Sequence, residues 1–535
     1  MTERLTGGEA VVKSLIGHEI DTVFGLPGVQ NDWLFNAFYD HADDIRIIHT
    51  RHEQGAAYMA LGSALATGEP AVFSVVPGPG FLNATAALAT AYGLNAKVLC
   101  LSGQIPRRAI GKGTGVLHEI PDQLGVMRSL TKWAARVNSA GEAPSKIAEA
   151  FQQMHSSRPQ PVGLEVPMDV LAERGVVEMD GDKLELYRSP IDTDKLSEAA
   201  KLLGRAETPL IFVGSGAQGV SDEVRQLAEM LQAPVVAYRT GRGIMDARHY
   251  LSLYQPSAKT YWQKVDVVFA IGSNLRVPLG KWAKTHRPKL IRLDVDVLSH
   301  ELFTVPEVAL TARAEDALPL LIEETAKHNK KRPSREEELT FLRNAWEKEV
   351  GVLEPQVSYL KAIREALGEE GIFVDELTQV GFASRIAYPV YKPRTYISTG
   401  YQGTLGYGFP TALGVKVARP EVPVVSITGD GGFMFGVQEL ATAVQQNIGL
   451  VTVVFNNNQY GNVQQMQKHL YEGRVIASDL HNPDFVKLAE AFGARGVCAE
   501  TPNALTAALE ESLGLNTPTL IEVSIGDVPS ADQFR

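Results

Sequence analysis

The stretch Val422-Pro-Val-Val-Ser-Ile-Thr-Gly-Asp-Gly-Gly432 decides the fold expected for this chain. Its apolar, β-branched half predicts a buried strand, and the glycines that follow let the backbone turn and approach an anion closely. Residues 437–448 carry apolar side chains at helical spacing, so a helix should follow the turn. Strands that alternate with helices in this way indicate a parallel sheet covered on both faces.

A second strand-like run, Leu450–Phe455, ends at Asn456-Asn-Asn-Gln-Tyr-Gly461. Asp430 and Asn457 therefore follow the carboxyl ends of two strands, which is where ligands bind in an open parallel sheet. Carboxylate and amide oxygens are hard donors that suit a small divalent cation with phosphate oxygens around it. Each motif alone is more often an ordinary turn or polar loop, but together they predict a metal held against a diphosphate.

The order and separation of the two motifs resemble the signature of thiamine-diphosphate-dependent enzymes. The resemblance implies that Asp430 and Asn457 supply side-chain ligands to Mg²⁺ and that Gln459 supplies a backbone carbonyl. The metal would in turn bind the diphosphate of thiamine diphosphate. The further cofactor contacts implied here are Thr378, Gly429, Gly431, Gly432 and Tyr460.

Enzymes of this kind also need a glutamate from an N-terminal domain, placed against N1′ of the cofactor's aminopyrimidine. Thr50–Ala57 opens a helix rich in small residues, and Glu53 is our candidate. A lone glutamate at a helix start more often serves only to stabilise the helix. The glycine-rich turns Phe24–Gly28 and Pro77–Asn83, however, resemble the pyrimidine-binding domain of acetohydroxyacid synthase, benzaldehyde lyase and pyruvate oxidase. By that resemblance Glu53 is the activating acid, and the turns add three cofactor contacts: Gly28, Pro79 and Asn83.

A third glycine-rich block, Ser398–Pro410, precedes another helix of small residues. In the family, a bulky apolar residue of this turn holds the cofactor in a bent conformation. A carbonyl two residues earlier accepts a hydrogen bond from the 4′ nitrogen. The matching positions are Leu405 and Gly403. Taken alone, the block fits a glycine turn with a core leucine equally well.

Bulk composition predicts a soluble globular protein rather than a nucleic-acid or membrane protein. Of the 535 residues, 44% are hydrophobic and 21% charged, and the formal net charge of −11 disfavours nucleic acid and anionic membranes as partners. No apolar stretch reaches membrane-spanning length, and the first residues lack the apolar core of a signal peptide, so we expect a cytoplasmic protein. Cys100 and Cys498 are interpreted as small core residues.

Three α/β domains are expected, each with a mainly parallel sheet flanked by helices. They are a pyrimidine-binding domain at 1–172, a central Rossmann-like domain at 190–326 and a diphosphate-binding domain at 355–535. A linker should occupy 173–190, and an exposed connector helix 327–349. The central domain has Gly272–Arg276 where flavin-binding synthases have an arginine-aspartate-rich turn, so FAD is slightly disfavoured.

The family resemblance implies a dimer whose active sites are shared between subunits, commonly paired into a tetramer. Three positions distinguish this member. Val29 stands where some decarboxylases place a proton-handling residue, and Met466 replaces the tryptophan of acetohydroxyacid synthases. His118 stands where relatives carry Gln or His; it can protonate or position an intermediate, or be purely structural.

The reaction that this pattern favours is decarboxylation of a 2-oxo acid with carboligation to an acceptor carbonyl, as in acetolactate synthase. Val29 cannot transfer a proton, which disfavours simple protonation of the intermediate. Non-oxidative decarboxylation and 2-hydroxyketone cleavage remain alternatives, and a flavin-dependent oxidase is less favoured. A non-enzymatic homologue is disfavoured because Glu53, Asp430 and Asn457 are all present.

Overall fold

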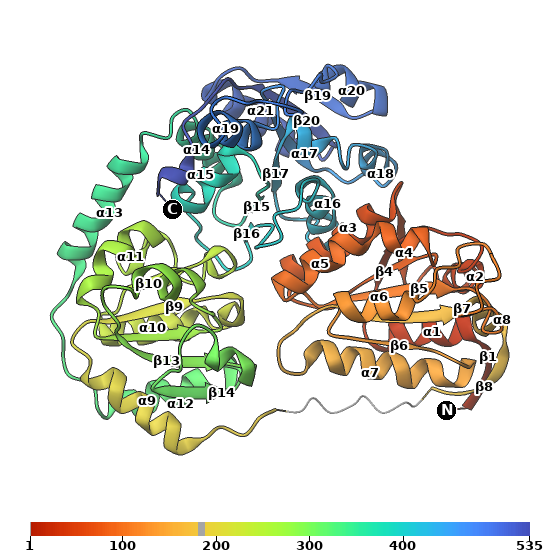
Figure 1. Ribbon diagram of the computed structural model, residues 1–535, viewed down its shortest axis with the longest axis horizontal. Helices are drawn as coiled ribbons and strands as arrows, with labels where there is room; N and C mark the ends of the chain where they lie inside the picture. Colours follow the sequence, from red (N-terminus) through yellow and green to blue (C-terminus); the bar gives the residue numbers. More distant parts are fainter. Residues whose placement is uncertain (1, 180–187, 535) are drawn as a thin grey trace.

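The computed structural model describes residues 2–179 and 188–534, which form three α/β units (Figure 1). Each unit contains a six-stranded sheet in which all neighbouring strands are parallel. Most strands are buried on both faces because helices cover the sheets, as parallel strands require. The predicted fold class is therefore confirmed.

The N-terminal unit has the strand order β3-β2-β4-β5-β7-β6. Its strands are β2 (Thr22–Gly25), β3 (Arg46–His49), β4 (Ala71–Val75), β5 (Val98–Gln104), β6 (Trp133–Arg136) and β7 (Val162–Pro167). Its helices are α1 (Gly7–Gly17), α2 (Asp32–Asp40), α3 (Glu53–Thr67), α4 (Pro79–Asn83), α5 (Thr85–Leu94), α6 (Gln123–Leu130), α7 (Ala143–His155) and α8 (Met168–Ala172). A separate antiparallel pair, β1 (Thr2–Thr6) with β8 (Arg174–Glu178), joins the two ends of the unit.

The middle unit has the order β11-β10-β9-β12-β13-β14 and its own hydrophobic core. Its strands are β9 (Pro209–Val213), β10 (Val235–Ala237), β11 (Ser252–Leu253), β12 (Val267–Ile271), β13 (Lys289–Asp294) and β14 (Val308–Thr311). Its helices are α9 (Thr193–Arg205), α10 (Ser221–Leu231), α11 (Gln255–Tyr261) and α12 (Ala314–Ala326). Helix α13 (Glu336–Val350) connects it to the last unit along the outside of the molecule (Figure 1).

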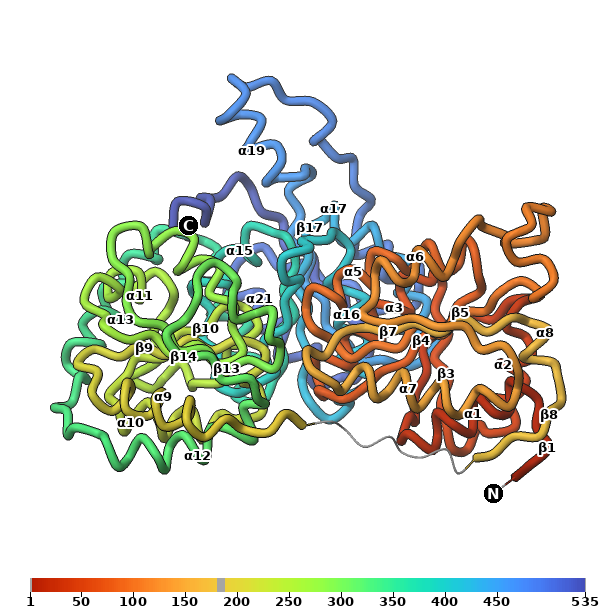
Figure 2. Tube along the Cα trace, turned by 60° about the horizontal axis from the view of Figure 1, so that its bottom comes forward, coloured from red at the N-terminus to blue at the C-terminus, as the bar shows by residue number. Residues whose placement is uncertain are grey.

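The C-terminal unit has the order β16-β15-β17-β18-β20-β19. Its strands are β15 (Ile372–Val374), β16 (Tyr396–Ile397), β17 (Val424–Gly429), β18 (Val451–Asn456), β19 (Arg495–Cys498) and β20 (Thr519–Ser524). Its helices are α14 (Gln356–Leu367), α15 (Gln379–Ala387), α16 (Gly408–Ala418), α17 (Asp430–Phe433), α18 (Glu439–Gln445), α19 (Gly461–Leu470), α20 (Phe485–Phe492) and α21 (Pro502–Gly514). Helix α19 and the segment after it extend beyond the rest of this unit (Figure 2).

The N-terminal and C-terminal units share one hydrophobic core, built where α3 packs against α16. Glycines allow the two helices to touch along their backbones. A Cβ atom on Gly414 would lie 1.9 Å from the carbonyl oxygen of Met59, and one on Gly62 would lie 2.0 Å from that of Thr411. The small residues of both helices are thus explained by close packing between units that are distant in sequence.

Two expectations about the connections and one about a cysteine need correction. The expected linker at 173–190 begins with strand β8, whose register with β1 ties it to the N-terminal unit; residues 180–187 of that linker lie outside the described part of the chain. The connector helix begins at Glu336 rather than at residue 327. Cys100 is buried as expected, but Cys498 is exposed on the edge strand β19. No helix of the described residues is both long and apolar enough to cross a membrane.

Candidate functional site

Strands β17 and β18 are neighbours, so their carboxyl ends bring the two predicted metal-binding motifs to one edge of the sheet. Gly429, the last residue of β17, pairs with Phe455 of β18. Asp430 then starts α17, and Asn457 follows β18 directly. Asp430 is only 2% exposed. Burial raises the pKa of its carboxyl group, while hydrogen bonds from the Asn482 amide and the backbone N–H groups of the loop act in the opposite direction.

Two glycines of the Gly429–Gly432 loop, Gly431 and Gly432, are required by what surrounds them. A Cβ atom on Gly431 would lie 2.5 Å from the Tyr460 ring, and one on Gly432 would lie 2.5 Å from a carboxylate oxygen of Glu376. Gly429 lies beside the side chain of Thr378, whose hydroxyl accepts hydrogen bonds from two backbone N–H groups at the start of α15. The sequence-predicted residues of this half are thus brought together.

Asn482 is a residue of this edge that sequence reasoning missed. Its Nδ2 donates to Asp430 Oδ2 at 2.6 Å and to Asn456 Oδ1 at 2.9 Å, and it lies 3.2 Å from Asn458 Oδ1. It is carried by the segment after α19, which returns to the sheet where Gln459 and Asp479 form an isolated bridge. Gln459, the predicted backbone ligand, directs its side chain away to Asp527.

A buried glutamate, Glu376, holds the turn that carries Gly403 and Leu405 through hydrogen bonds to its backbone. Gly403 has a φ of +59°, which favours glycine. Glu376 Oε1 accepts from the backbone N–H of Gly406 at 2.6 Å, and Oε2 accepts from that of Gly408 at 3.1 Å. Burial raises the pKa of Glu376 to about 7, opposed by hydrogen bonds from the Thr428 hydroxyl and the two N–H groups. Glu376 therefore joins this turn to the Gly429–Gly432 loop, a role that sequence reasoning also missed.

The N-terminal half of the candidate site collects around Glu53, the first residue of α3. Its Oε2 accepts from Asn83 Nδ2 at 3.0 Å, and a Cβ atom on Gly80 would lie 3.3 Å from its Oε1. Gly80 follows Pro79 at the start of α4. Cβ atoms on Gly80 and on Gly28 would each lie 2.6 Å from a methyl group of Val76. The two glycine turns and Glu53 therefore meet at the carboxyl edge of the N-terminal sheet.

His118 belongs to the same edge and is held in one orientation. It has a φ of 68°, and its carbonyl covers Gly78, where a Cβ atom would lie 2.4 Å from the His118 oxygen. Gln30 Nε2 donates to the Leu117 carbonyl at 2.9 Å, so Gln30 Oε1 faces His118 Nδ1, also at 2.9 Å. An amide oxygen only accepts, so Nδ1 carries the proton and Nε2 is left free to accept one.

A buried carboxylate of the C-terminal unit holds the start of the Glu53 helix. Glu439 accepts from the backbone N–H groups of Arg51 and His52 at 3.1 and 3.0 Å, and from the Thr442 hydroxyl at 2.6 Å. Burial raises the pKa of Glu439, and these hydrogen bonds oppose the rise. Within residues 2–179 and 188–534, no hydrogen bond joins Glu53 itself to the Gly429–Gly432 loop.

The donor atoms at the β17–β18 edge fit a hard divalent cation. Asp430 and Asn457 offer oxygen atoms, and the loop between them and the sheet carries glycines, which bring no side chain between the backbone and a ligand. Clusters of three or more His, Cys, Asp or Glu side chains that could bind a metal do not occur in the described residues. The oxygen donors of Asp430 and Asn457 are of the type that binds a hard cation together with phosphate oxygens and water, not a soft metal.

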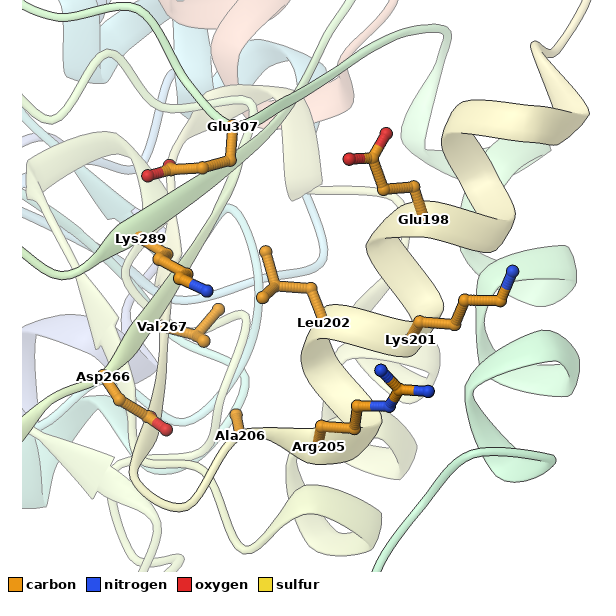
Figure 3. Close-up of a pocket in the computed structure, with 9 residues that line it drawn as sticks. All are labelled: Glu198, Lys201, Leu202, Arg205, Ala206, Asp266, Val267, Lys289 and Glu307. Carbon is orange, nitrogen blue, oxygen red and sulfur yellow. The ribbon is translucent and has the colours of Figure 1, made fainter.

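The cavity in Figure 3 is separate from this site. It measures about 530 Å³ and lies in the middle unit, between α9 and the beginnings of β12 and β13. Lysine, arginine and acidic side chains line it in balanced numbers, and it contains none of the candidate residues. It lies where the strands begin, whereas ligands of such sheets bind where strands end.

Models of thiamine pyrophosphate enzyme domains match three parts of the chain. The N-terminal TPP binding domain matches residues 5–126, the central domain 196–321, and the C-terminal TPP binding domain 377–523. Their order is the order of the three units described above. The first two matches fall within the predicted ranges 1–172 and 190–326, and the third falls within 355–535.

Curated proteins resemble the chain over nearly its whole length. The probable acetolactate synthase large subunit of Methanocaldococcus jannaschii is 31% identical over 97% of this chain and 92% of its own. The acetolactate synthase isozyme 3 large subunit of Escherichia coli is 31% identical over 96% and 92%. The probable 2-ketoarginine decarboxylase of Pseudomonas aeruginosa is also 31% identical, over 97% and 94%.

Proposed function

The chain belongs to the thiamine pyrophosphate enzymes, a family of 2-oxo acid decarboxylases and carboligases, and we propose that it decarboxylates a 2-oxo acid and joins the product to an acceptor carbonyl. The observation that carries this proposal is that the chain has two sheet edges with complementary sets of residues. One presents Glu53 with Asn83 and His118, and the other presents Asp430 and Asn457 behind a glycine loop.

Asp430, Asn457 and the carbonyl of Gln459 would hold Mg²⁺, and the backbone of the Gly429–Gly432 loop would bind the diphosphate. Bound thiamine diphosphate supplies the electron sink that a 2-oxo acid needs to lose CO₂. Glu53 would present its carboxyl group to N1′ of the aminopyrimidine, with Asn83 fixing its orientation through their hydrogen bond. Gly403 and Leu405 would form the side of the cofactor site opposite Glu53, and Glu376 would hold their turn in place.

Carboligation is preferred because of what surrounds Gly28. The next residue, Val29, is exposed and cannot deliver a proton. His118 can accept one at Nε2, because Gln30 fixes the hydrogen on Nδ1. An acceptor carbonyl that becomes a hydroxyl must obtain a proton from nearby, so His118 would carry that proton or orient the acceptor.

Simple decarboxylation is the second candidate, because Met466 stands where acetohydroxyacid synthases have tryptophan. Its side chain is half exposed on α19 and more adaptable than an indole ring. A pocket lined in this way would accept a longer substrate chain. The similarity to the probable 2-ketoarginine decarboxylase, equal in identity to that of the synthases, keeps this reaction in view.

Product analysis would distinguish the two reactions. Purified protein would be incubated with Mg²⁺, thiamine diphosphate and pyruvate or a longer 2-oxo acid, with and without an aldehyde or second 2-oxo acid as acceptor. A 2-hydroxyketone or acetohydroxy acid would support carboligation. Aldehyde as the sole product, unchanged by acceptor, would contradict it and favour the decarboxylase.

Exposed apolar side chains support the further proposal that two copies build each site together. They gather on both edges and on α19, and a solitary chain would leave them in water. Around the Glu53 edge they are Val29, Leu82 and Leu117; around the glycine loop they are Tyr401, Met434 and Phe435; on α19 and after it they are Val463, Met466, Leu470, Tyr471 and Ile476.

Mixed dimers would test this sharing. Glu53→Gln and Asp430→Ala variants should each be inactive alone. If Glu53 of one copy serves the loop of the other, coexpression should restore about a quarter of the parent activity. The reason is that half of the dimers would be mixed, and one of the two sites in each mixed dimer would be intact. Failure to recover any activity from demonstrated mixed dimers would refute shared sites.

A further inference from the structure

A chain of amide hydrogen bonds runs from strand β20 to the predicted metal ligand Asp430. Asn456 Nδ2 donates to Glu522 Oε1 of β20 at 2.7 Å. Asn456 Oδ1 accepts from Asn482 Nδ2 at 2.9 Å, and Asn482 Nδ2 also donates to Asp430 Oδ2 at 2.6 Å. Asn456 Oδ1 accepts as well from the backbone N–H of Asn458 at 3.1 Å.

The chemistry of these partners fixes which way each amide points. A carboxylate only accepts hydrogen bonds, so the group that faces Glu522 must be the NH₂ of Asn456, and its oxygen must face Asn482. The group of Asn482 that faces this oxygen and the Asp430 carboxylate must then be its NH₂. Its two hydrogens match the two nearest acceptors, and the third contact, to Asn458 Oδ1 at 3.2 Å, is longer.

One consequence concerns the geometry of Asp430. Its Oδ2 accepts a short hydrogen bond from Asn482, and this bond, together with the backbone N–H groups that also donate to the carboxylate, fixes which lone pairs face a cation. Without this donor Oδ2 would lose its only side-chain hydrogen bond from Asn482, and the buried carboxylate would be held in its orientation by backbone N–H groups alone. Residues that orient a metal ligand in this way typically change metal affinity by about 10- to 100-fold when they are removed.

We propose that Asn482 is the positioning residue of the cation site, which orients Asp430 through its side-chain amide. The inference rests on the proposed function, because it assigns Asn482 to the same Mg²⁺-diphosphate site. Nothing in the sequence motifs marks this residue, which lies in the segment after α19 and far along the chain from Asp430.

The segment that carries Asn482 is held by other contacts, so a change at this side chain should act locally. The backbone N–H of Leu480 donates to the Asn458 carbonyl at 2.8 Å, and that of Tyr460 donates to the Ser478 carbonyl at 2.8 Å. Gln464 Nε2 donates to Asp479 Oδ1 at 2.8 Å. These bonds do not involve the Asn482 side chain, and they keep the segment against the sheet edge.

The test measures binding rather than turnover. Mg²⁺ would be titrated into the full-length protein with saturating thiamine diphosphate, and the dissociation constant read by calorimetry and by intrinsic fluorescence. Asn482→Ala should weaken Mg²⁺ binding by about 10- to 100-fold. Asn482→Leu, which keeps most of the volume but lacks the donor, should weaken it similarly. The neighbouring His481→Ala, whose side chain is exposed, should bind Mg²⁺ as the parent does.

Two further readouts separate positioning from general support of the structure. Thermal unfolding without cofactor should show a similar decrease in Tm for Asn482→Ala and Asn482→Leu, since both remove the donor to the buried Asp430 carboxylate. Turnover of Asn482→Ala should nevertheless return close to the parent value at saturating Mg²⁺. Parent-like Mg²⁺ affinity in both Asn482 variants would overturn this inference but not the proposed function. Absence of any Mg²⁺-dependent binding of thiamine diphosphate to the parent would overturn the proposed function, and the inference with it.

Discussion

Replacing Glu376 by glutamine should change how the free energy of unfolding depends on pH. The carboxyl group is fully buried between the Gly403–Gly408 turn and the Gly429–Gly432 loop. Its pKa is about 7 in the folded chain against an ordinary value of 4.5. Between those two values the folded state binds more protons than the unfolded state, so the free energy of unfolding must fall as pH rises.

The size of this fall follows from the pKa difference. One pKa unit corresponds to about 1.4 kcal/mol, so the rise at Glu376 is worth about 3 kcal/mol in full, of which about three quarters falls between pH 5 and pH 8. Burial is the main cause, and the charge of the neighbouring Asp375 adds to it. Glutamine does not titrate. The stability advantage of the parent over Glu376→Gln should therefore shrink by about 2–3 kcal/mol as pH is raised from 5 to 8.

Urea unfolding of the two proteins at both pH values would measure this change. The control is Glu337→Gln, whose side chain is exposed on α13 and whose difference from the parent should not depend on pH. If the gap between the parent and Glu376→Gln stayed constant from pH 5 to pH 8, Glu376 would not be the titrating group that its burial implies, and the reasoning would fail.

The remaining predictions concern the two edges. Glu53→Gln should bind thiamine diphosphate in calorimetry yet lose turnover by about 10²- to 10⁴-fold, and parent-like turnover would rule out Glu53 as the activating acid. Chelation of metal should abolish turnover and Mg²⁺ should restore it in the parent, whereas Asp430→Ala should not recover. Gln30→Leu frees the ring of His118, so product ratios should change in chromatographic assays as they do in His118→Ala; unchanged ratios in both would make His118 structural. Glu439→Ala orphans two backbone N–H groups and should lower the free energy of unfolding by about 2–4 kcal/mol, seen as a reduced Tm, while an unchanged Tm would show that Glu439 does not hold α3.

The parts of the site that lie within one strand-turn-helix segment were predictable from sequence. The apolar runs before Gly429 and Asn456 predict buried strands. Asp430 and Asn457 follow the last residues of these strands, so their positions at the sheet edge could be predicted as well. Glu53 was singled out because the glycine turns that flank it in sequence resemble those of a pyrimidine-binding domain, and in the structure these turns meet it.

The parts that depend on distant contacts were not predictable in this way. Asn482 reaches Asp430 only because the segment after α19 folds back to the sheet, and Glu376 matters only because the Gly403–Gly408 turn closes over it. Short or polar edge strands such as β16 and β19 lack an apolar run long enough to be recognised. Strand β8 is charged, and its pairing with β1 depends on the closure of a whole unit.

The shared core of α3 and α16 has a consequence for how the protein is made. During synthesis, α3 leaves the ribosome long before α16, since the whole middle unit is translated in between. At a synthesis rate of about 5–20 residues per second, the apolar face of α3 stays uncovered on the order of tens of seconds before α16 is synthesised. The apolar surface of α3 must therefore be shielded from aggregation during that interval. A chain truncated after its first unit would expose the part of the shared core that α16 normally covers.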